Sequence, residues 1–174
     1  MSNSEGREVH MEIERKYLVT QLPENLSQYK FKKIEQGYLC HNPTIRVRKS
    51  NQDYILTYKS KLGIEKTTEN SAVINNEVEL PLTKGAYEEL KAKTDGNIVY
   101  KTRYLIPIAN KLTAELDIFE DRLLGLVMVE VEFPDEMSAN EFLPPKWFGK
   151  ELSSDKRFSN YHLSKLSDYK ELDI

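Results

Sequence analysis

The chain has 174 residues, of which 39% are hydrophobic and 10% aromatic, and this is enough to bury the core of one domain. Twenty-five basic residues stand against 28 acidic ones, so the charge balance argues against a nucleic-acid partner. Cys40 is the only cysteine, which excludes an intrachain disulfide and a zinc site built from several cysteines.

The polar residues at the start of the chain lack the apolar core of a signal peptide, and no segment has the roughly 18 apolar residues of a membrane span. We therefore expect a cytoplasmic protein with no membrane partner. Residues 1–10 are predicted to be a disordered N-terminal extension, followed by one domain over residues 11–174.

Short segments with alternating apolar and polar residues predict strands in the first half of the chain. The first strand is expected at 12–19, and a turn with a short helix follows at 24–30. The next strands are expected at 32–40, 43–50 and 52–61. The polar segment 60–73 predicts a mobile loop, and alternation resumes at 73–82.

The second half begins with a predicted helix over 82–94, in which Leu82, Ala86, Leu90 and Ala92 lie on one face. Strands are expected at 97–108, 111–119 and 126–133. A short helix over 138–148 ends at Pro144-Pro145, and the tail over 159–172 is weakly helical. Many short strands with few helices favour an α+β chain, mainly antiparallel β, built as a barrel or sandwich.

Charged residues recur at every second position on strand after strand. The acids are Glu12, Glu14, Glu77, Glu79, Glu115, Asp117, Glu130 and Glu132, and the bases are Lys16, Arg46, Arg48, Lys59, Lys101 and Arg103. One such pair on a single strand is usually the solvated face of an ordinary sheet. The complete set, with apolar residues between the charges, instead favours a closed eight-stranded barrel. Its charged faces would point into a tunnel, and its apolar faces would lie under outer helices.

A tunnel lined by both signs of charge is unfavourable when empty, because like charges repel and buried charges need partners. A polyanion would pair with the bases, and divalent cations would pair with the acids. Arginine forks and lysine ammonium groups suit phosphate oxygens, while carboxylates select hard ions, Mg²⁺ or Mn²⁺. The pattern therefore predicts a metal–polyphosphate ligand.

An ordered series of motifs resembles the CYTH superfamily, the triphosphate tunnel metalloenzymes. Glu12, Glu14 and Lys16 match its N-terminal ExExK signature. The similarity continues through EQGYL, RVRK, YILTYKS, EVEL, YKTRY, ELDIF, GLVMVEVEF and WFGKELSSDKRFSN, and it spans residues 11–166. The resemblance implies an eight-stranded antiparallel barrel around a tunnel, with helices packed outside.

The resemblance also implies roles for the charged residues. It assigns metal binding first to Glu12, Glu14, Asp117, Glu130 and Glu132, and triphosphate binding to Lys16, Arg46, Arg48, Lys59 and Arg103, with Lys101 close by. It implies hydrolysis of a small-molecule triphosphate, and the short bacterial inorganic triphosphatases, which cleave tripolyphosphate to pyrophosphate and phosphate, are the most similar members.

Other activities remain alternatives at this stage. Some members of the family hydrolyse thiamine triphosphate, and some cyclise ATP to cyclic AMP. A sensor that binds polyphosphate or nucleotides without turnover is the alternative outside enzymes, although anion binding alone does not need so many carboxylates. Apolar outer surfaces would also allow a homodimer.

Three candidates could activate the attacking water, and the sequence does not choose between them. Tyr38 could act as the base if nearby cations lower its pKa from about 10. Lys16 could act if neighbouring bases lower its own pKa. A metal ion could activate the water without a side-chain base.

The sequence departs from the family pattern at one position in the phosphate site. Asn75 stands where many relatives carry a basic residue, so one phosphate contact would be missing or supplied by Lys61 or Lys66. The three histidines, His10, His41 and His162, are spaced too widely for a metal site and are predicted to be surface or capping residues.

Overall fold

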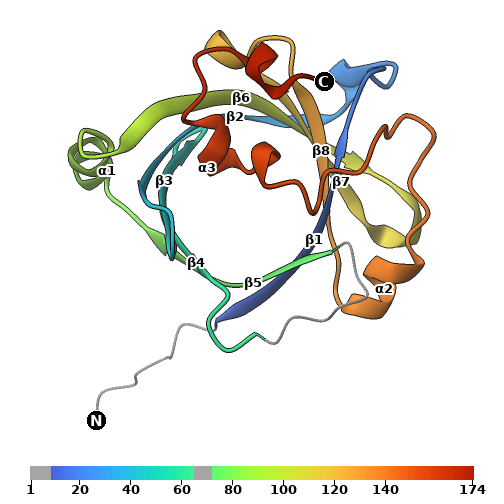
Figure 1. Cartoon of the computed structure of the whole chain (residues 1–174), viewed down its shortest axis with the longest axis horizontal. Helices are drawn as coiled ribbons and strands as arrows, with labels where there is room; N and C mark the ends of the chain where they lie inside the picture. The colour runs from blue at the N-terminus through green and yellow to red at the C-terminus, as the bar shows by residue number, and fades with distance from the viewer. Residues whose placement is uncertain (1–8, 65–71) are drawn as a thin grey trace.

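Eight antiparallel strands close into a barrel in this computed structural model, which describes residues 9–64 and 72–174 (Figure 1). Around the barrel the strands follow the order β1-β5-β4-β3-β2-β6-β7-β8. Their bounds are β1 His10–Leu18, β2 Lys30–Cys40, β3 Thr44–Ser50, β4 Asp53–Ser60, β5 Val73–Pro81, β6 Asp95–Pro107, β7 Thr113–Phe119 and β8 Val127–Glu132. The predicted α+β class and closed barrel are confirmed.

Helices α1 (Lys84–Lys91) and α2 (Glu136–Glu141) lie outside the barrel wall (Figure 1). The side chain of Thr83 caps α1 by accepting a hydrogen bond from the backbone N–H of Ala86. The predicted apolar face of this helix is wrong in detail. Tyr87 is the residue that α1 buries, because its ring reaches the ring of Tyr54 on β4, with centroids 5.1 Å apart.

An apolar core lies between the outer barrel wall and the segment after β8. The wall contributes Ile13, Tyr17, Leu116, Val129 and Val131, and the covering segment contributes Ala139, Phe142 and Phe148. Arg15 holds this cover in place, since its guanidinium donates to both carboxylate oxygens of Glu151, at 2.9 and 2.7 Å, and to the carbonyl of Ala139 at 2.9 Å. The outward apolar faces are thus covered, as the sequence required.

A second apolar core fills one end of the barrel from inside. Val99, Phe119 and Met128 lie on the inward faces of their strands, two residues from charged positions, and they pack against Leu152, Phe158 and Leu163 from the C-terminal part of the chain. Helix α3 (Asn160–Leu163) therefore lies across this end and not on the outer wall, within the ring of strands in Figure 1.

Contacts on opposite walls show that the C-terminal segment spans this end. Lys16 on β1 donates from Nζ to the carbonyl of Phe158 at 3.4 Å. On the β2–β3 side, Tyr161 stacks on His41 with ring centroids 4.0 Å apart. Apolar residues of the tail need burial, and the barrel end supplies it. The placement of all helices outside the barrel is therefore corrected.

The short helices differ from the predicted bounds. The segment at 24–30 forms only a single 3₁₀ turn, Leu26–Gln28. The helix predicted over 138–148 begins at Glu136 and ends at Glu141, before Pro144-Pro145. The tail forms α3 and a 3₁₀ turn at Tyr169–Leu172.

Two predictions fall largely outside the described residues, namely most of the extension over 1–10 and the central part of the loop over 60–73. His10, at the end of the predicted extension, already belongs to β1. The single domain over 11–174 stays a prediction. Within the described ranges, no helix has the length and apolar character needed to cross a membrane.

Candidate active site

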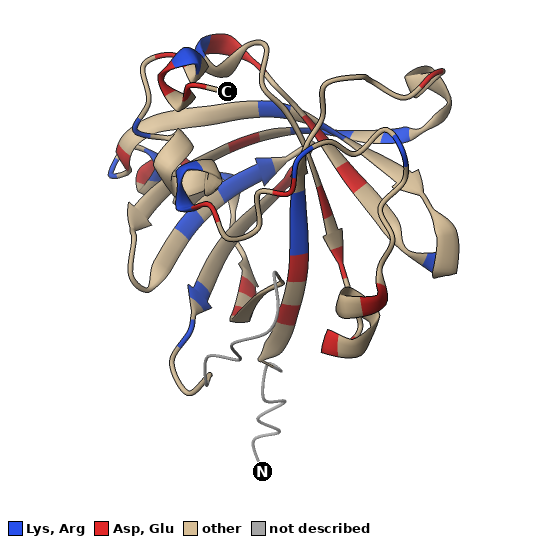
Figure 2. Ribbon diagram, turned by 45° about the vertical axis from the view of Figure 1, so that its right-hand side comes forward, with Lys and Arg blue, Asp and Glu red and all other residues tan. Residues whose placement is uncertain are grey.

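The charged positions of the barrel strands face its interior. Paired residues on neighbouring strands share a face, and the register pairs Lys16 with Glu130, Arg103 with Asp117, and Lys59 with Glu77. Figure 2 shows acidic and basic positions along the strands. The fold thus places all the predicted residues on one inner surface: the acids Glu12, Glu14, Glu77, Glu79, Glu115, Asp117, Glu130 and Glu132, and the bases Lys16, Arg46, Arg48, Lys59, Lys101 and Arg103.

Arg103 is the centre of the most buried ion-pair network. Its Nε and Nη2 donate to the two carboxylate oxygens of Asp117, each at 2.6 Å, and Nη2 also donates to Glu130 at 2.8 Å. Nη1 donates to Glu115, and Lys101 Nζ donates to Asp117 at 2.6 Å. Burial alone would raise the pKa of Asp117, but the Arg103 and Lys101 charges outweigh it and hold that pKa below its usual value.

A second network joins β4 to the acids of β1 and β5. Lys59 Nζ donates to both carboxylate oxygens of Glu12, at 2.7 and 2.6 Å, and lies 2.8 Å from Glu77 Oε2. Burial and the nearby charge of Glu14 nevertheless raise the pKa of Glu12 to about 7. This wall therefore carries more negative charge than Lys59 compensates, and a cation bound here would be stabilised.

The arginine wall has the opposite imbalance. Arg46 is only 6% exposed; its Nη2 donates to Thr57 at 3.0 Å and lies 3.7 Å from Glu79, but its buried Nε has no hydrogen-bond partner among the described residues. Arg48 donates from Nε to Gln36 at 3.1 Å. Burial and the neighbouring guanidinium groups lower the pKa of Arg48 to about 10. An anion would supply the missing acceptor for these arginines.

The acids fit a hard divalent cation by ligand type, because such ions prefer carboxylate oxygens. Within residues 9–64 and 72–174, no three His, Cys, Asp or Glu side chains are close enough together to hold a metal ion. Carboxylates such as Glu12 and Glu130 contact lysine or arginine instead. They would have to exchange these partners for a metal, and the raised pKa of Glu12 marks the place where that exchange is favoured.

The structure does not meet the condition for Tyr38 to act as a base. Tyr38 is buried, and its hydroxyl accepts a hydrogen bond from Gln36 at 2.9 Å. Burial raises the pKa of Tyr38, and the charge of Arg46 and its neighbours offsets this only in part. The same holds for Lys16: burial lowers its pKa, but Glu130, 2.9 Å away, outweighs burial and leaves that pKa raised. Both groups keep their protons at neutral pH.

Two further residues on the inner surface were not predicted as part of the site. Gln36 is fully buried and joins Arg48 to Tyr38, and its signal in the sequence is its place in the EQGYL motif, two residues before Tyr38. His10 was predicted to be a surface or capping residue. It is exposed, but it lies opposite Glu77 in the register, and its Nε2 is 2.6 Å from Glu132.

The remaining predicted positions lie at the edge of the site or away from it. Asn75 is the register partner of Glu12, so it occupies the inner surface as the family pattern requires. Lys61 is exposed, and Lys66 lies outside the described residues. His41 stacks on the tail, and His162 is exposed on α3.

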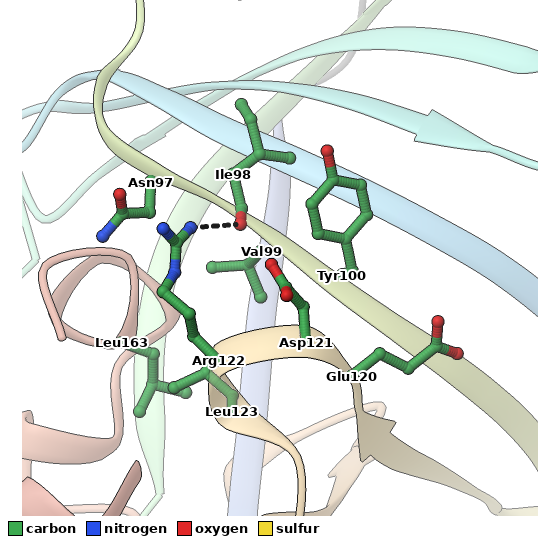
Figure 3. Close-up of a pocket in the computed structure, with 9 residues that line it drawn as sticks. All are labelled: Asn97, Ile98, Val99, Tyr100, Glu120, Asp121, Arg122, Leu123 and Leu163. Carbon is green, nitrogen blue, oxygen red and sulfur yellow. Dashed lines mark hydrogen bonds between the residues drawn. The ribbon is translucent and has the colours of Figure 1, made fainter. Parts of the chain in front are cut away.

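A small cavity of about 10 Å³ lies away from the charged surface, between the start of β6, the β7–β8 connection and α3 (Figure 3). Leu123 and Leu163 are among its lining residues, and Arg122 donates to the carbonyl of Ile98 at 3.5 Å. Its volume suffices for about one water molecule. This cavity is therefore too small for a triphosphate, and none of the predicted site residues lines it.

A family model described as the CYTH domain matches residues 10–165. An inorganic triphosphatase from Nitrosomonas europaea is 36% identical over 157 residues, which cover 88% of this chain and 96% of that protein. An inorganic triphosphatase from Acetivibrio thermocellus is 31% identical over 156 residues, which cover 88% and 93%.

Solved structures have the same fold. The crystal structure of an inorganic triphosphatase matches with a TM-score of 0.63 and 34% identity, over 91% of this chain and 97% of the other. A putative adenylyl cyclase from Hippeastrum, reported to have a dominant triphosphatase activity, matches with a TM-score of 0.58 over 89% of this chain and 97% of the other. At 15% identity, this second likeness concerns the fold alone.

Proposed function

The chain belongs to the CYTH domain family, and on that premise we propose that it is an enzyme that hydrolyses inorganic tripolyphosphate to pyrophosphate and phosphate. The observation that carries the proposal is the buried arginine wall, where Arg46 Nε lacks a hydrogen-bond partner among the described residues. A chain of phosphate groups supplies acceptors for such a wall and carries no apolar part that would need a pocket. Relatives named inorganic triphosphatase support the same substrate.

The bases would bind and orient the substrate. Arg46 and Arg48 present guanidinium forks to phosphate oxygens, and Lys59, Lys101 and Arg103 add charge from the neighbouring walls. Because Thr57 holds Arg46 and Gln36 holds Arg48 in place, these two arginines need little reorganisation to bind the anion. Lys59, Lys101 and Arg103 would exchange their acidic partners for phosphate oxygens. Positioning and charge stabilisation supply most of the catalysis in phosphoryl transfer.

The acids would hold Mg²⁺ or Mn²⁺ as the cofactor. Glu12, Glu14, Asp117, Glu130 and Glu132 are the main proposed ligands, with Glu77, Glu79 and Glu115 on the adjoining strands. When bound, such an ion supplies positive charge that offsets the charge on the phosphate oxygens.

Lys16 and Tyr38 would act as hydrogen-bond donors. Each keeps its proton at neutral pH in this structure, and each lies beside the charged networks. We therefore propose that they orient phosphate oxygens and do not accept the proton of the attacking water. A cytoplasmic location and a small-molecule partner, with no nucleic acid, complete the proposal.

The test is incubation of the purified protein with tripolyphosphate, ATP or thiamine triphosphate, each with Mg²⁺ or Mn²⁺. Phosphate, pyrophosphate and cyclic AMP are measured. We expect the highest kcat/KM for tripolyphosphate. Formation of cyclic AMP would favour a cyclase, faster release from thiamine triphosphate would favour that substrate, and tight binding without turnover would favour a sensor.

A further inference from the structure

The two ends of the barrel differ in what covers them. The C-terminal segment crosses the end where β2 finishes, since Tyr38 near the end of β2 contacts the ring of Tyr161 at 5.7 Å between centroids. The start of β2 lies at the opposite end. Its first four residues, Lys30 to Lys33, are all exposed.

The strand register places two of these residues on the inner surface. Lys32 is paired with Arg103, whose side chain binds Asp117 inside the barrel, and Lys30 is paired with Leu105 two residues further along. Paired residues share a face, so Lys30 and Lys32 continue the basic inner surface to the rim. Lys33 lies on the outer face, where its Nζ pairs with Glu120 at 2.7 Å.

The rim lysines differ from the deeper bases in having no acidic partner. Neither the Lys30 nor the Lys32 side chain makes a hydrogen bond or an ion pair with any residue that the structure describes, whereas the bases farther inside are bonded to acids, to Thr57 or to Gln36. They line a groove of about 490 Å³ together with Asn51 and Leu105. Their full charge therefore faces the solvent in front of the barrel.

Acids occupy other parts of the inner surface near solvent. The side chains of Glu79, Glu115 and Glu132 are 43%, 36% and 53% exposed, more than most of the acids inside. They would repel an approaching polyphosphate. Unpaired positive charge on one side of such an opening focuses the field and directs an anion along that side.

We propose that Lys30 and Lys32 are entry residues, which attract the triphosphate anion to the end of the barrel where β2 begins and guide it along β2 to Arg103. The proposal rests on the proposed function, because it concerns the approach of that substrate. The entry residues act before the reacting atoms meet. They therefore raise kcat/KM through association and leave kcat unchanged.

The test compares two double variants that remove the same net charge. Lys30→Gln/Lys32→Gln removes the charges of the entry residues. Lys33→Gln/Lys49→Gln removes two lysine charges of the outer face. Lys49 lies on that face because it is opposite Glu35 in the strand register, and the Glu35 side chain binds α1 outside the barrel. At low ionic strength we expect kcat/KM for tripolyphosphate to fall about threefold to tenfold in the first variant only. The deficit should shrink as KCl is raised, because salt screens exposed charges.

Two further double variants change the charge at positions 30 and 32 by different amounts. Lys30→Arg/Lys32→Arg should keep the wild-type kcat/KM, and Lys30→Glu/Lys32→Glu should lose more than the glutamine variant. An unchanged kcat/KM at low salt, an equal loss in the outer-face variant, or a parallel fall in kcat would overturn the entry role. If the wild-type protein hydrolyses no triphosphate, the proposed function itself fails, and this outcome is distinct from normal kinetics in the entry variant.

Discussion

At the scale of single residues, Glu130 carries the strongest prediction because two interior bases share it. Its carboxylate lies 2.9 Å from Lys16 Nζ and accepts from Arg103 at 2.8 Å. Glu130→Gln keeps the shape and removes the charge. Changes in residues around a metal site typically cost about 10–100-fold, and loss of a direct ligand should cost at least as much in kcat/KM for tripolyphosphate.

Phosphate release at saturating Mn²⁺ measures this loss, and the Mn²⁺ concentration for half-maximal activity should rise. Glu120→Gln is the matched control, since Glu120 lies on the outer face and binds Lys33 and Thr102. A wild-type rate in Glu130→Gln would remove this residue from the proposed metal site.

Substitution of Arg103 is expected to lower the stability of the fold as well as the activity. Its guanidinium is buried and forms ion pairs with three carboxylates, Glu115, Asp117 and Glu130. Arg103→Met leaves these acids without their main partner, and breaking a buried ion pair from one side costs about 3–5 kcal/mol. Urea unfolding should show this loss, whereas Arg122→Met, at an exposed position, should change the free energy of unfolding by less than about 0.5 kcal/mol. Equal stability of the two variants would contradict the prediction.

At the scale of elements, one carboxylate fastens α1 to the barrel. Glu35 on β2 accepts from Tyr87 Oη at 2.7 Å and from Lys91 Nζ at 3.0 Å. Burial raises the pKa of Glu35, but these two donors outweigh burial and lower it below its usual 4.5. A lowered acid pKa stabilises the fold fully above pH 4.5, and the contribution is lost as the pH falls through the folded-state value.

Glu35→Gln should therefore destabilise the protein by about 1 kcal/mol at pH 7 and by much less at pH 3. Chemical unfolding at the two pH values measures the difference. Glu89→Gln on the same helix is the control, because its pair with Lys93 is exposed and such pairs contribute little. A loss of the same size at both pH values would show that packing, and not charge, is responsible.

Strands could be predicted more closely than helices, for a physical reason. Alternation marks a strand wherever one face is charged and the other is covered, and both conditions hold in sequences such as that of β3. Helix α2 is only 6 residues long and is held by the outer core, so its own sequence carries little signal. The burial of Tyr87 instead of the predicted leucines and alanines follows from contacts with β4 and β2, which no local pattern contains.

At the scale of the whole molecule, barrel closure followed from combining all the charged strands, since any one of them could have been a solvated face. The composition of the inner surface was predictable in this way. The pairing of charges on this surface was not predictable. The raised pKa of Tyr38 depends on its burial, and the lack of a partner for Arg46 Nε among the described residues depends on where Thr57 and Glu79 lie. The covered end was also missed, because the tail shows no charged pattern that would place Phe158 and Leu163 inside the barrel.

The ion pairs across the barrel interior lead us to expect that metal and substrate stabilise the protein cooperatively. In this structure acids and bases pair across the barrel, as Lys59 does with Glu12, and each ligand must break such pairs. An anion that binds alone takes the bases from their pairs and leaves the acids without a partner. A metal ion that binds alone takes the acids and leaves the bases without a partner. Together they satisfy both, so each should tighten binding of the other.

Thermal unfolding with imidotriphosphate, in which NH replaces the bridging oxygens and blocks hydrolysis, measures this coupling. A ligand at about 100 times its Kd adds about 2.7 kcal/mol, which for a chain of this size raises Tm by about 5–10 °C. With Mn²⁺ and imidotriphosphate together, we expect a rise that exceeds the sum of the separate rises, and EDTA should remove the excess. In Glu130→Gln the excess should be smaller, because the pairs of Glu130 with Lys16 and Arg103 no longer have to be broken, while the pair of Lys59 with Glu12 remains. Strictly additive rises in the wild-type protein would mean that the two ligands do not share the paired interior, and the metal would then have to be placed outside it.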